Sequence, residues 1–164
     1  MFNSIAEIVK VDDLTATTSA PLYTPGVVHK GSGNSYVYVY NAAASTAIAT
    51  GKYASLDVNG GTSFTSGYSV SVSAASLAGV LVGVAQSTIS TGHYGWLMYN
   101  GVSLVSPDSG EVSANAGVYL ALGTDGGFIA AGATFSTASR VGITLNSFIT
   151  GATSKARLFG SIIA

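Results

Sequence analysis

The sequence has few charged residues and no cysteine. Charged side chains make up 8% of its 164 residues, about a third of the roughly 25% that is usual in globular domains. A freely soluble monomer normally keeps apart from its neighbours through surface charge. A surface rich in Ser, Thr, Gly, Ala, Asn and Tyr is dehydrated at less cost, because few ions must give up their water. We therefore expect permanent contact with other protein chains, including copies of this one.

The residue types that are missing also exclude several kinds of partner and site. Without cysteine, neither a disulfide nor a thiolate metal site can form. The net charge is −1 and no basic stripe or polybasic segment occurs, so we expect neither nucleic acid nor a membrane as a partner. The longest apolar run, residues 77–85, contains glycines and is far shorter than the roughly 20 residues that span a bilayer.

The chain also lacks a catalytic or metal-binding signature. Its histidines are His29 and His93, and it has no nucleophile elbow, His-x-x-x-His or His-Glu-x-x-His motif. A Ser-His-Asp triad that joins His93 to Asp57 or Asp108 is formally possible, but a hydrogen-bonded surface histidine explains the same residues. We expect no enzyme activity, no catalytic residues, no metal and no cofactor.

The first 34 residues differ in composition from the rest. They contain two of the three prolines, a stretch rich in Thr and Ser, and many of the charged residues. We interpret residues 1–34 as an extended N-terminal arm and residues 35–164 as the body of the protein. A disordered terminus would have the same composition. The first residues lack the positive and apolar regions of a signal peptide, so we expect synthesis in the cytoplasm.

The body shows the alternation that is typical of β-strands. Residues 36–40 read Tyr-Val-Tyr-Val-Tyr, with tyrosines on one face and valines on the other. Asn100-Gly101 lies between two apolar runs and is typical of a two-residue hairpin turn, in which both residues need positive φ. Helical periodicity is nearly absent, so we expect an all-β fold, a compact barrel or sandwich. Strands are predicted at residues 36–40, 67–73, 79–85, 94–99, 102–105, 117–122, 128–130, 140–145 and 157–163.

The aromatic residues offer a candidate contact surface. Tyr36, Tyr38 and Tyr40 share one face of a predicted strand. Tyrosine gives a large contact area at a low entropic cost and is enriched at interfaces, although an ordinary half-buried strand has the same pattern. Trp96, the only tryptophan, follows Gly95. We favour the interpretation that Trp96 is anchored in the core and that the adjacent glycine lets a neighbouring strand approach closely. A ligand site is the alternative.

Several short motifs occur together in this charge-poor, cysteine-free chain. They are Gly83-Val84-Ala85-Gln86, a polar turn over residues 89–92, Tyr94-Gly95-Trp96, Gly101, and Gly117-Val118-Tyr119-Leu120. Over residues 78–130 this pattern resembles the small decoration, or cement, proteins of tailed-phage capsids. The resemblance implies a homotrimer with a β-barrel or β-tulip-like sandwich body on the outer surface of the expanded capsid. It also implies an N-terminal arm that adds to the edge of a capsid-protein sheet.

These expectations together describe a structural virion protein. A homotrimer would bind the major capsid protein and stabilise the shell by bridging neighbouring subunits, because binding to the assembled state alone stabilises that state. The alternative is a carbohydrate-binding or adhesin module of a phage head or tail fibre, whose aromatic rings would stack on sugars. The candidate capsid or subunit contacts are Ile5, Ile8, Val9 and Val11 in the arm and Tyr36, Tyr38, Tyr40 and Trp96 in the body. In the carbohydrate-binding alternative, the four aromatic residues of the body would stack on the sugar.

Overall fold

The computed structural model contains ten strands and one short 3₁₀ helix in the part of the chain that it describes. The described residues are 11–43, 45–56, 69–72, 81–109, 114–123, 126–130, 141–149 and 151–159. The elements in chain order are η1 (Val11–Thr15), β1 (Val28–Gly31), β2 (Asn34–Asn41), β3 (Tyr53–Leu56), β4 (Ser69–Val72), β5 (Leu81–Ala85), β6 (Tyr94–Val105), β7 (Tyr119–Leu122), β8 (Phe128–Ala130), β9 (Gly142–Thr144) and β10 (Ser154–Phe159). The all-β prediction is confirmed. None of the helical structure in these ranges is long and apolar enough to cross a membrane.

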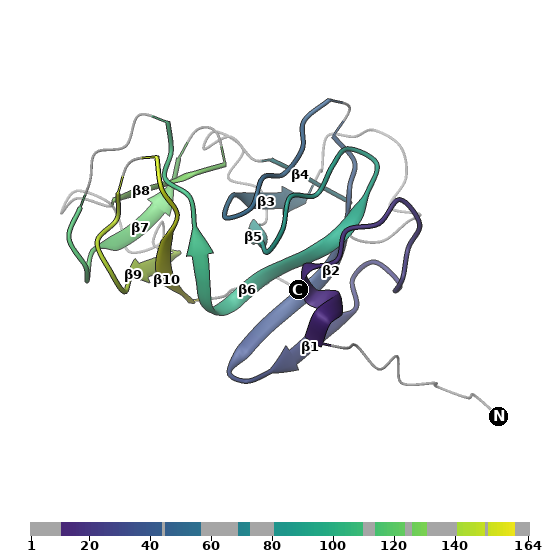
Figure 1. The fold of residues 1–164 in the computed structure, drawn as a ribbon, viewed down its shortest axis with the longest axis horizontal. Helices are drawn as coiled ribbons and strands as arrows, with labels where there is room; N and C mark the ends of the chain where they lie inside the picture. The colour runs from purple at the N-terminus through teal and green to yellow at the C-terminus, as the bar shows by residue number, and fades with distance from the viewer. Residues whose placement is uncertain are drawn as a thin grey trace.

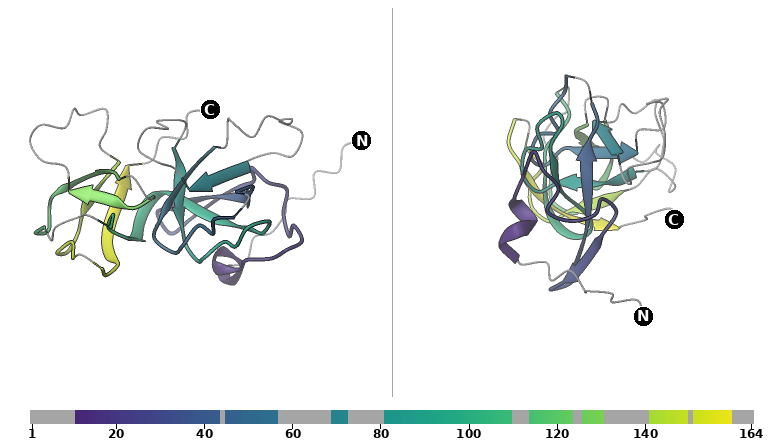
Figure 2. Two further views of the ribbon diagram at one scale, coloured as in Figure 1. Left: turned by 90° about the horizontal axis from the view of Figure 1, so that it is seen from above. Right: turned by 90° about the vertical axis from the view of Figure 1, so that its right-hand side faces the viewer.

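The strands form one sheet that divides into two lobes (Figure 1). Its order is β1-β2-β4-β3-β5-β6-β10-β9-β7-β8, and β2 also pairs with β6. This extra pairing links β2, β4, β3, β5 and β6 in a ring, which with η1 and β1 we call the N-terminal lobe. The end of β6 with β10, β9, β7 and β8 makes an open C-terminal lobe, also visible in Figure 2. The sheet as a whole is not closed, so of the two forms expected, barrel or sandwich, the architecture is the sandwich-like one.

Strand β6 runs through both lobes without a turn, so the predicted Asn100-Gly101 hairpin is wrong. β6 pairs with β2 and β5 in its first part and with β10 in its second. Gly101 has a φ of 115°, whereas Asn100 is not among the residues with positive φ. The glycine therefore bends one long strand as it passes from one lobe to the other.

The two-residue turn with positive φ lies instead between β1 and β2. Ser32 has a φ of 53° and Gly33 a φ of 78°, and Gly31 pairs with Asn34 across the turn. Two consecutive residues with positive φ are the signature of the type I′ hairpin. The predicted boundary between an arm of residues 1–34 and a body of residues 35–164 thus falls beside this turn, inside a hairpin.

Residues 11–31, which we call the N-terminal segment, pack on the ring of strands in the N-terminal lobe. Leu14 of η1 is 8% exposed and belongs to the main core cluster. The backbone of Thr18 forms two hydrogen bonds with that of Tyr94, because each N–H donates to the other residue's carbonyl, at 3.1 and 2.8 Å. The described part of the predicted arm is therefore packed against the body. Residues 1–10 lie outside the described residues.

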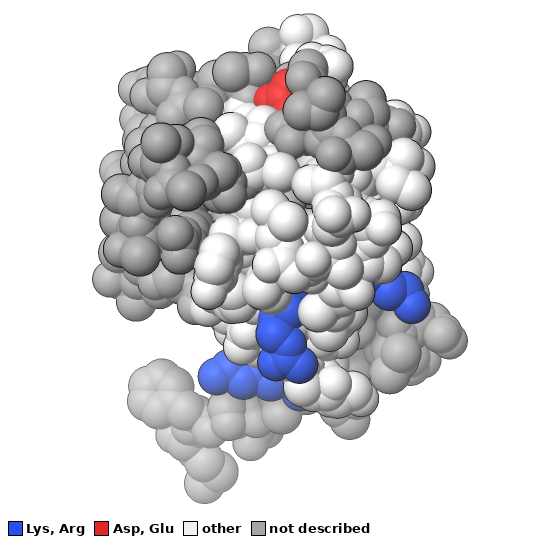
Figure 3. Space-filling model, turned by 90° about the vertical axis from the view of Figure 1, so that its left-hand side faces the viewer, with Lys and Arg blue, Asp and Glu red and all other residues white. Residues whose placement is uncertain are grey.

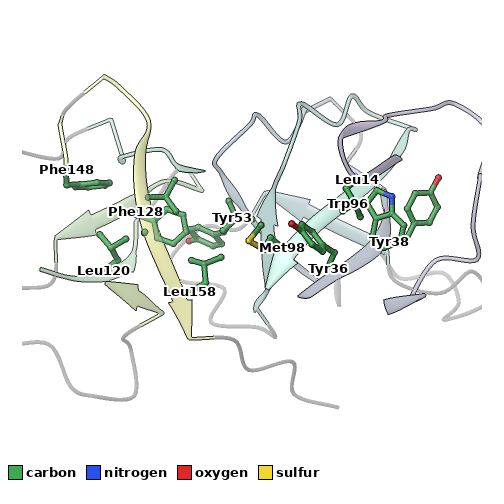
Figure 4. Packing of buried hydrophobic residues seen from close by; sticks show 13 residues of the cluster. Leu14, Tyr36, Tyr38, Tyr53, Trp96, Met98, Leu120, Phe128, Phe148 and Leu158 are labelled. Atoms are coloured by element: carbon green, nitrogen blue, oxygen red, sulfur yellow. The ribbon is translucent and has the colours of Figure 1, made fainter. Parts of the chain in front are cut away.

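The main hydrophobic core is continuous through both lobes (Figure 4). It extends from Leu14 and Trp96 in the N-terminal lobe through Tyr53 to Leu120 and Phe148 in the C-terminal lobe. A second cluster covers the opposite face of β2 and consists of Val37, Val39, Ile48, Ala54, Ala85, Ile89 and Leu97. Strand β2 is consequently buried on both faces, so its tyrosine–valine alternation separates two cores instead of a core and a solvated surface.

Candidate interaction surfaces

The aromatic residues predicted as contacts are mostly interior. The exposed fraction is 9% for Tyr36, 1% for Tyr38 and 1% for Trp96, and Tyr40 is half-buried. The core interpretation of Trp96 therefore fits the structure, and the tyrosine face is not an open surface of the single chain. Of the contacts predicted in the arm, Val11 begins η1, while Ile5, Ile8 and Val9 lie outside the described residues.

The N-terminal segment brings a further ring into this aromatic cluster. The ring centroid of Tyr23 lies 5.4 Å from that of Tyr38 and 5.5 Å from that of Trp96, which are themselves 5.0 Å apart. Tyr94 continues the row, since its ring lies 6.0 Å from that of Tyr38 and 4.9 Å from that of Tyr40. Edge-on and offset ring pairs of this kind stabilise an interior beyond their buried area.

Hydrogen bonds hold the N-terminal segment over these rings. The hydroxyl of Tyr23 donates to the carboxylate of Asp13, and the hydroxyl of Tyr38 accepts from the backbone N–H of Leu22 at 3.1 Å. The chain thus covers with its own residues the face that the sequence suggested for partners or sugars. Of the four predicted rings, Tyr40 alone keeps appreciable exposure.

A different surface carries most of the exposed large apolar side chains. Eight such side chains occur in the described part of the chain; six belong to the C-terminal lobe, namely Ile149 between β9 and β10 and five others in or beside its strands. The exposed fractions of these five are 39% for Val102, 46% for Leu104, 39% for Tyr119, 47% for Leu145 and 46% for Phe159. Isolated exposed apolar residues are normal, but a contiguous group marks an interaction site.

The strand register places these side chains next to one another. Arg157 of β10 is the Cα partner of both Val102 in β6 and Ile143 in β9, and Ile143 is in turn the partner of Tyr119 in β7. Residues directly opposite in neighbouring strands share one face of the sheet. One row of side chains therefore crosses all four strands.

Further contacts complete this group. Lys155 is the partner of Leu104, the backbone N–H of Leu145 donates to the carbonyl of Lys155 at 2.9 Å, and the rings of Tyr119 and Phe159 lie 6.2 Å apart. We call the whole group the outer face. It consists of Val102, Leu104, Tyr119, Ile143, Leu145, Lys155, Arg157 and Phe159.

The outer face carries positive charge and no carboxylate. Lys155 and Arg157 are exposed, and no ion pair of either head group occurs within the described ranges. Figure 3 views the molecule from the end of the C-terminal lobe. Lys and Arg atoms gather at its lower edge, an acidic group lies near the upper edge, and uncharged surface lies between them. The sequence analysis missed this face, although the alternation of residues 154–159 was a usable signal.

His93 and Asp108, the two described residues considered for a triad, are not brought together. His93 precedes β6 and its Nδ1 lies 3.0 Å from the carbonyl oxygen of Thr91. Asp108 follows the other end of β6 and packs against the β7–β8 connection, where a Cβ added to Gly123 would lie 1.9 Å from its Oδ2. Asp57 lies outside the described residues. Among the residues that the structure describes, no three His, Cys, Asp or Glu side chains form a group suited to a metal ion.

Comparison with known proteins gives a similarity of fold. No protein-family model and no curated protein matches the sequence. Among solved structures, the chain is similar to the head fibre gp8.5 N base of bacteriophage phi29, with a TM-score of 0.53 and 13% sequence identity. The alignment covers 79% of this chain and 98% of that one. The two proteins therefore share an architecture over almost the whole of the head-fibre base.

Proposed function

We propose that this chain is a structural protein of a bacteriophage particle that binds the outer surface of the capsid. The observation that carries the proposal is the fold shared with a phage head-fibre base over 98% of that base. The content of 8% charged residues supports it independently, because a charge-poor surface suits permanent protein contacts better than free solution. The proposed role is structural and not catalytic.

The finer proposal is a cement function. A homotrimer binds the major capsid protein and bridges neighbouring subunits, so that the assembled shell is stabilised by mass action. Three copies held together also raise the effective concentration of each binding element at the shell. In this proposal neither nucleic acid nor a membrane is a partner. If this chain were instead the base of a head fibre, we would expect it to bind the outer surface of the capsid as well.

The proposed arm is shorter than the sequence suggested. Residues from Val11 onward are engaged by the body through η1, Leu14 and Thr18. We therefore assign the arm's contact with the capsid to Ile5, Ile8 and Val9, which would add an extended strand to the edge of a capsid-protein sheet.

Co-sedimentation with expanded empty capsids tests this proposal. The capsids are assembled from the major capsid protein encoded in the same genome. We expect the full chain to sediment with them to a saturable level, and light scattering of the free chain to give three times the 16.4 kDa mass of one copy. Deletion of residues 1–10 should weaken binding while the body stays folded. A chain that stays in the supernatant would refute capsid binding, and undiminished binding of the truncated chain would refute the arm's role.

The carbohydrate-binding alternative is favoured by one observation, since the structural neighbour is part of a fibre. Sugar stacking on Tyr36, Tyr38 and Trp96 would need these rings at the surface, and they are at most 9% exposed. Of the four rings predicted for this alternative, half-buried Tyr40 is the one that a sugar could still reach. Glycan-array binding that is lost in Tyr40→Ala would support the alternative, whereas an array without signal would remove it.

A further inference from the structure

We propose that the outer face of the C-terminal lobe docks against a different protein whose surface presents carboxylates among apolar side chains. This inference rests on the proposed function, because the capsid shell is the partner on which it is tested. The outer face includes none of the residues that the sequence analysis named as candidate contacts.

The residue types at its exposed positions distinguish the outer face from an ordinary solvated sheet surface. The inward side chains of Ser154, Ala156 and Leu158 are buried, and the outward positions are exposed. An antiparallel sheet with one solvated face normally places polar residues outward. Here the outward positions of β6, β10, β9 and β7 carry mainly aliphatic and aromatic side chains. A sheet with apolar residues on both faces is typical of one that is covered on both.

The charges on this face argue against a second copy of the chain as its occupant. A two-fold symmetric contact centred on this face would bring Lys155 and Arg157 of two copies close together, and like charges across an interface cost several kcal/mol in general. A contact with another part of a second copy would need accessible carboxylates. Light scattering of the outer-face variant tests for such a contact.

A partner with carboxylates fits the same geometry. Arg157 lies in the row between Val102 and Ile143, so an aliphatic residue is its partner in each neighbouring strand. Guanidinium binds a carboxylate through two parallel hydrogen bonds, and such charge-assisted bonds are about twice as strong as neutral ones. The surrounding aliphatic and aromatic side chains would exclude water from that ion pair.

The test compares two double variants that change the net charge equally and that each replace one exposed aliphatic side chain by threonine. Leu104→Thr with Arg157→Glu alters the outer face. Val28→Thr with Lys30→Glu alters exposed residues of β1, at the opposite end of the sheet. Each variant trims one exposed aliphatic side chain and changes the net charge by the same amount. Circular dichroism and thermal unfolding establish that both variants fold like the unmodified chain.

Co-sedimentation with expanded empty capsids is the readout. We expect Leu104→Thr with Arg157→Glu to weaken binding by about tenfold or more, as loss of a central interface group does, and the β1 variant to bind within about twofold of the unmodified chain. Raising NaCl from about 0.05 M to about 0.3 M should weaken the unmodified chain more than the outer-face variant, because salt screens ion pairs.

Each other outcome overturns a distinct statement. If the unmodified chain binds capsids and both variants bind equally well, the outer face is not the docking surface, although the proposed function stands. If the outer-face variant changes the mass of the free chain by light scattering, the occupant is a second copy and the inference is wrong. If the unmodified chain does not bind capsids, the proposed function fails and the inference fails with it.

Discussion

At the scale of single residues, the bend in β6 depends on Gly101. Its φ is 115°, and a Cβ at this position would lie 2.1 Å from Oδ1 of Asn34 and 2.9 Å from its Cα. Oδ1 of Asn34 accepts a hydrogen bond from the backbone N–H of Val102 at 3.1 Å. The asparagine beside the β1–β2 turn thus occupies the space that a side chain would need, and it holds β6 where the strand changes lobes.

Gly101→Ala should therefore destabilise the protein strongly. A positive φ costs a residue with a Cβ about 1–2 kcal/mol, and the steric conflict with Asn34 adds about 1–3 kcal/mol. Gly117→Ala is the matched control, because Gly117 also has positive φ, 81°, but has nothing within 4 Å of an added Cβ. The free energy of unfolding in urea measures both. Equal losses in the two variants would contradict the role of the close contact with Asn34.

The same residue shows a limit of reading turns from dipeptides. Asn-Gly predicts a turn because both residues tolerate positive φ, but Gly101 uses that freedom inside a continuous strand. Ser32 and Gly33 form the turn with two positive φ values, although serine has less tendency than asparagine to adopt this conformation. Tertiary contacts of Gly101 with Asn34 and β10 keep Asn100-Gly101 within a strand, and the turn forms at Ser32-Gly33. A local sequence pattern carries no information about such contacts.

At the scale of elements, the N-terminal segment acts as a cover for the aromatic cluster. Its side chains Leu14 and Tyr23 pack against the rings of β2 and β6, and its backbone bonds to Tyr94. The composition of residues 1–34 predicted an arm, because Pro, Thr and Ser are frequent in segments without a core of their own. The segment has no core of its own, but its apolar side chains pack into the core of the N-terminal lobe.

Two leucines of this segment test whether it stays packed in solution. Leu14→Ala should cost about 2–5 kcal/mol of unfolding free energy, as truncation of a buried leucine does. Leu22→Ala should change stability by no more than about 0.5 kcal/mol, because Leu22 is 51% exposed and Leu14 only 8%. Denaturant unfolding followed by circular dichroism measures both. A Leu14→Ala variant as stable as Leu22→Ala would show that the segment does not contribute to the core.

At the scale of the whole molecule, the two lobes share a junction as well as a core. The hydroxyl of Tyr53 donates to the carbonyl of Gly123 at 2.8 Å, and its N–H donates to the carbonyl of Gly126 at 2.8 Å. The hydroxyl of Ser106 donates to the carbonyl of Thr50 at 3.0 Å. Strand β3 of one lobe is thereby joined to the β7–β8 connection of the other, while β6 passes through both.

This continuity predicts that the lobes unfold together. Trp96 is the only tryptophan and lies in the N-terminal lobe, so its fluorescence reports that lobe alone, whereas far-ultraviolet circular dichroism reports both. We expect the two signals to give one coincident transition in urea, as cooperative unfolding requires. A fluorescence transition displaced from the dichroism transition would mean that each lobe unfolds independently.

The sequence by itself determined the fold class and most strands. Alternation with a period of two identifies strands because neighbouring side chains point to opposite faces, and the predicted return at residues 123–127 is the connection of a β7–β8 hairpin. Alternation does not say what covers each face. Only the tertiary structure decided that β2 is covered on both sides, that the tyrosine face is closed by residues 11–31, and that the outer face of the C-terminal lobe remains open. The physical reason is that exposure depends on which strands and segments meet across long separations in the chain.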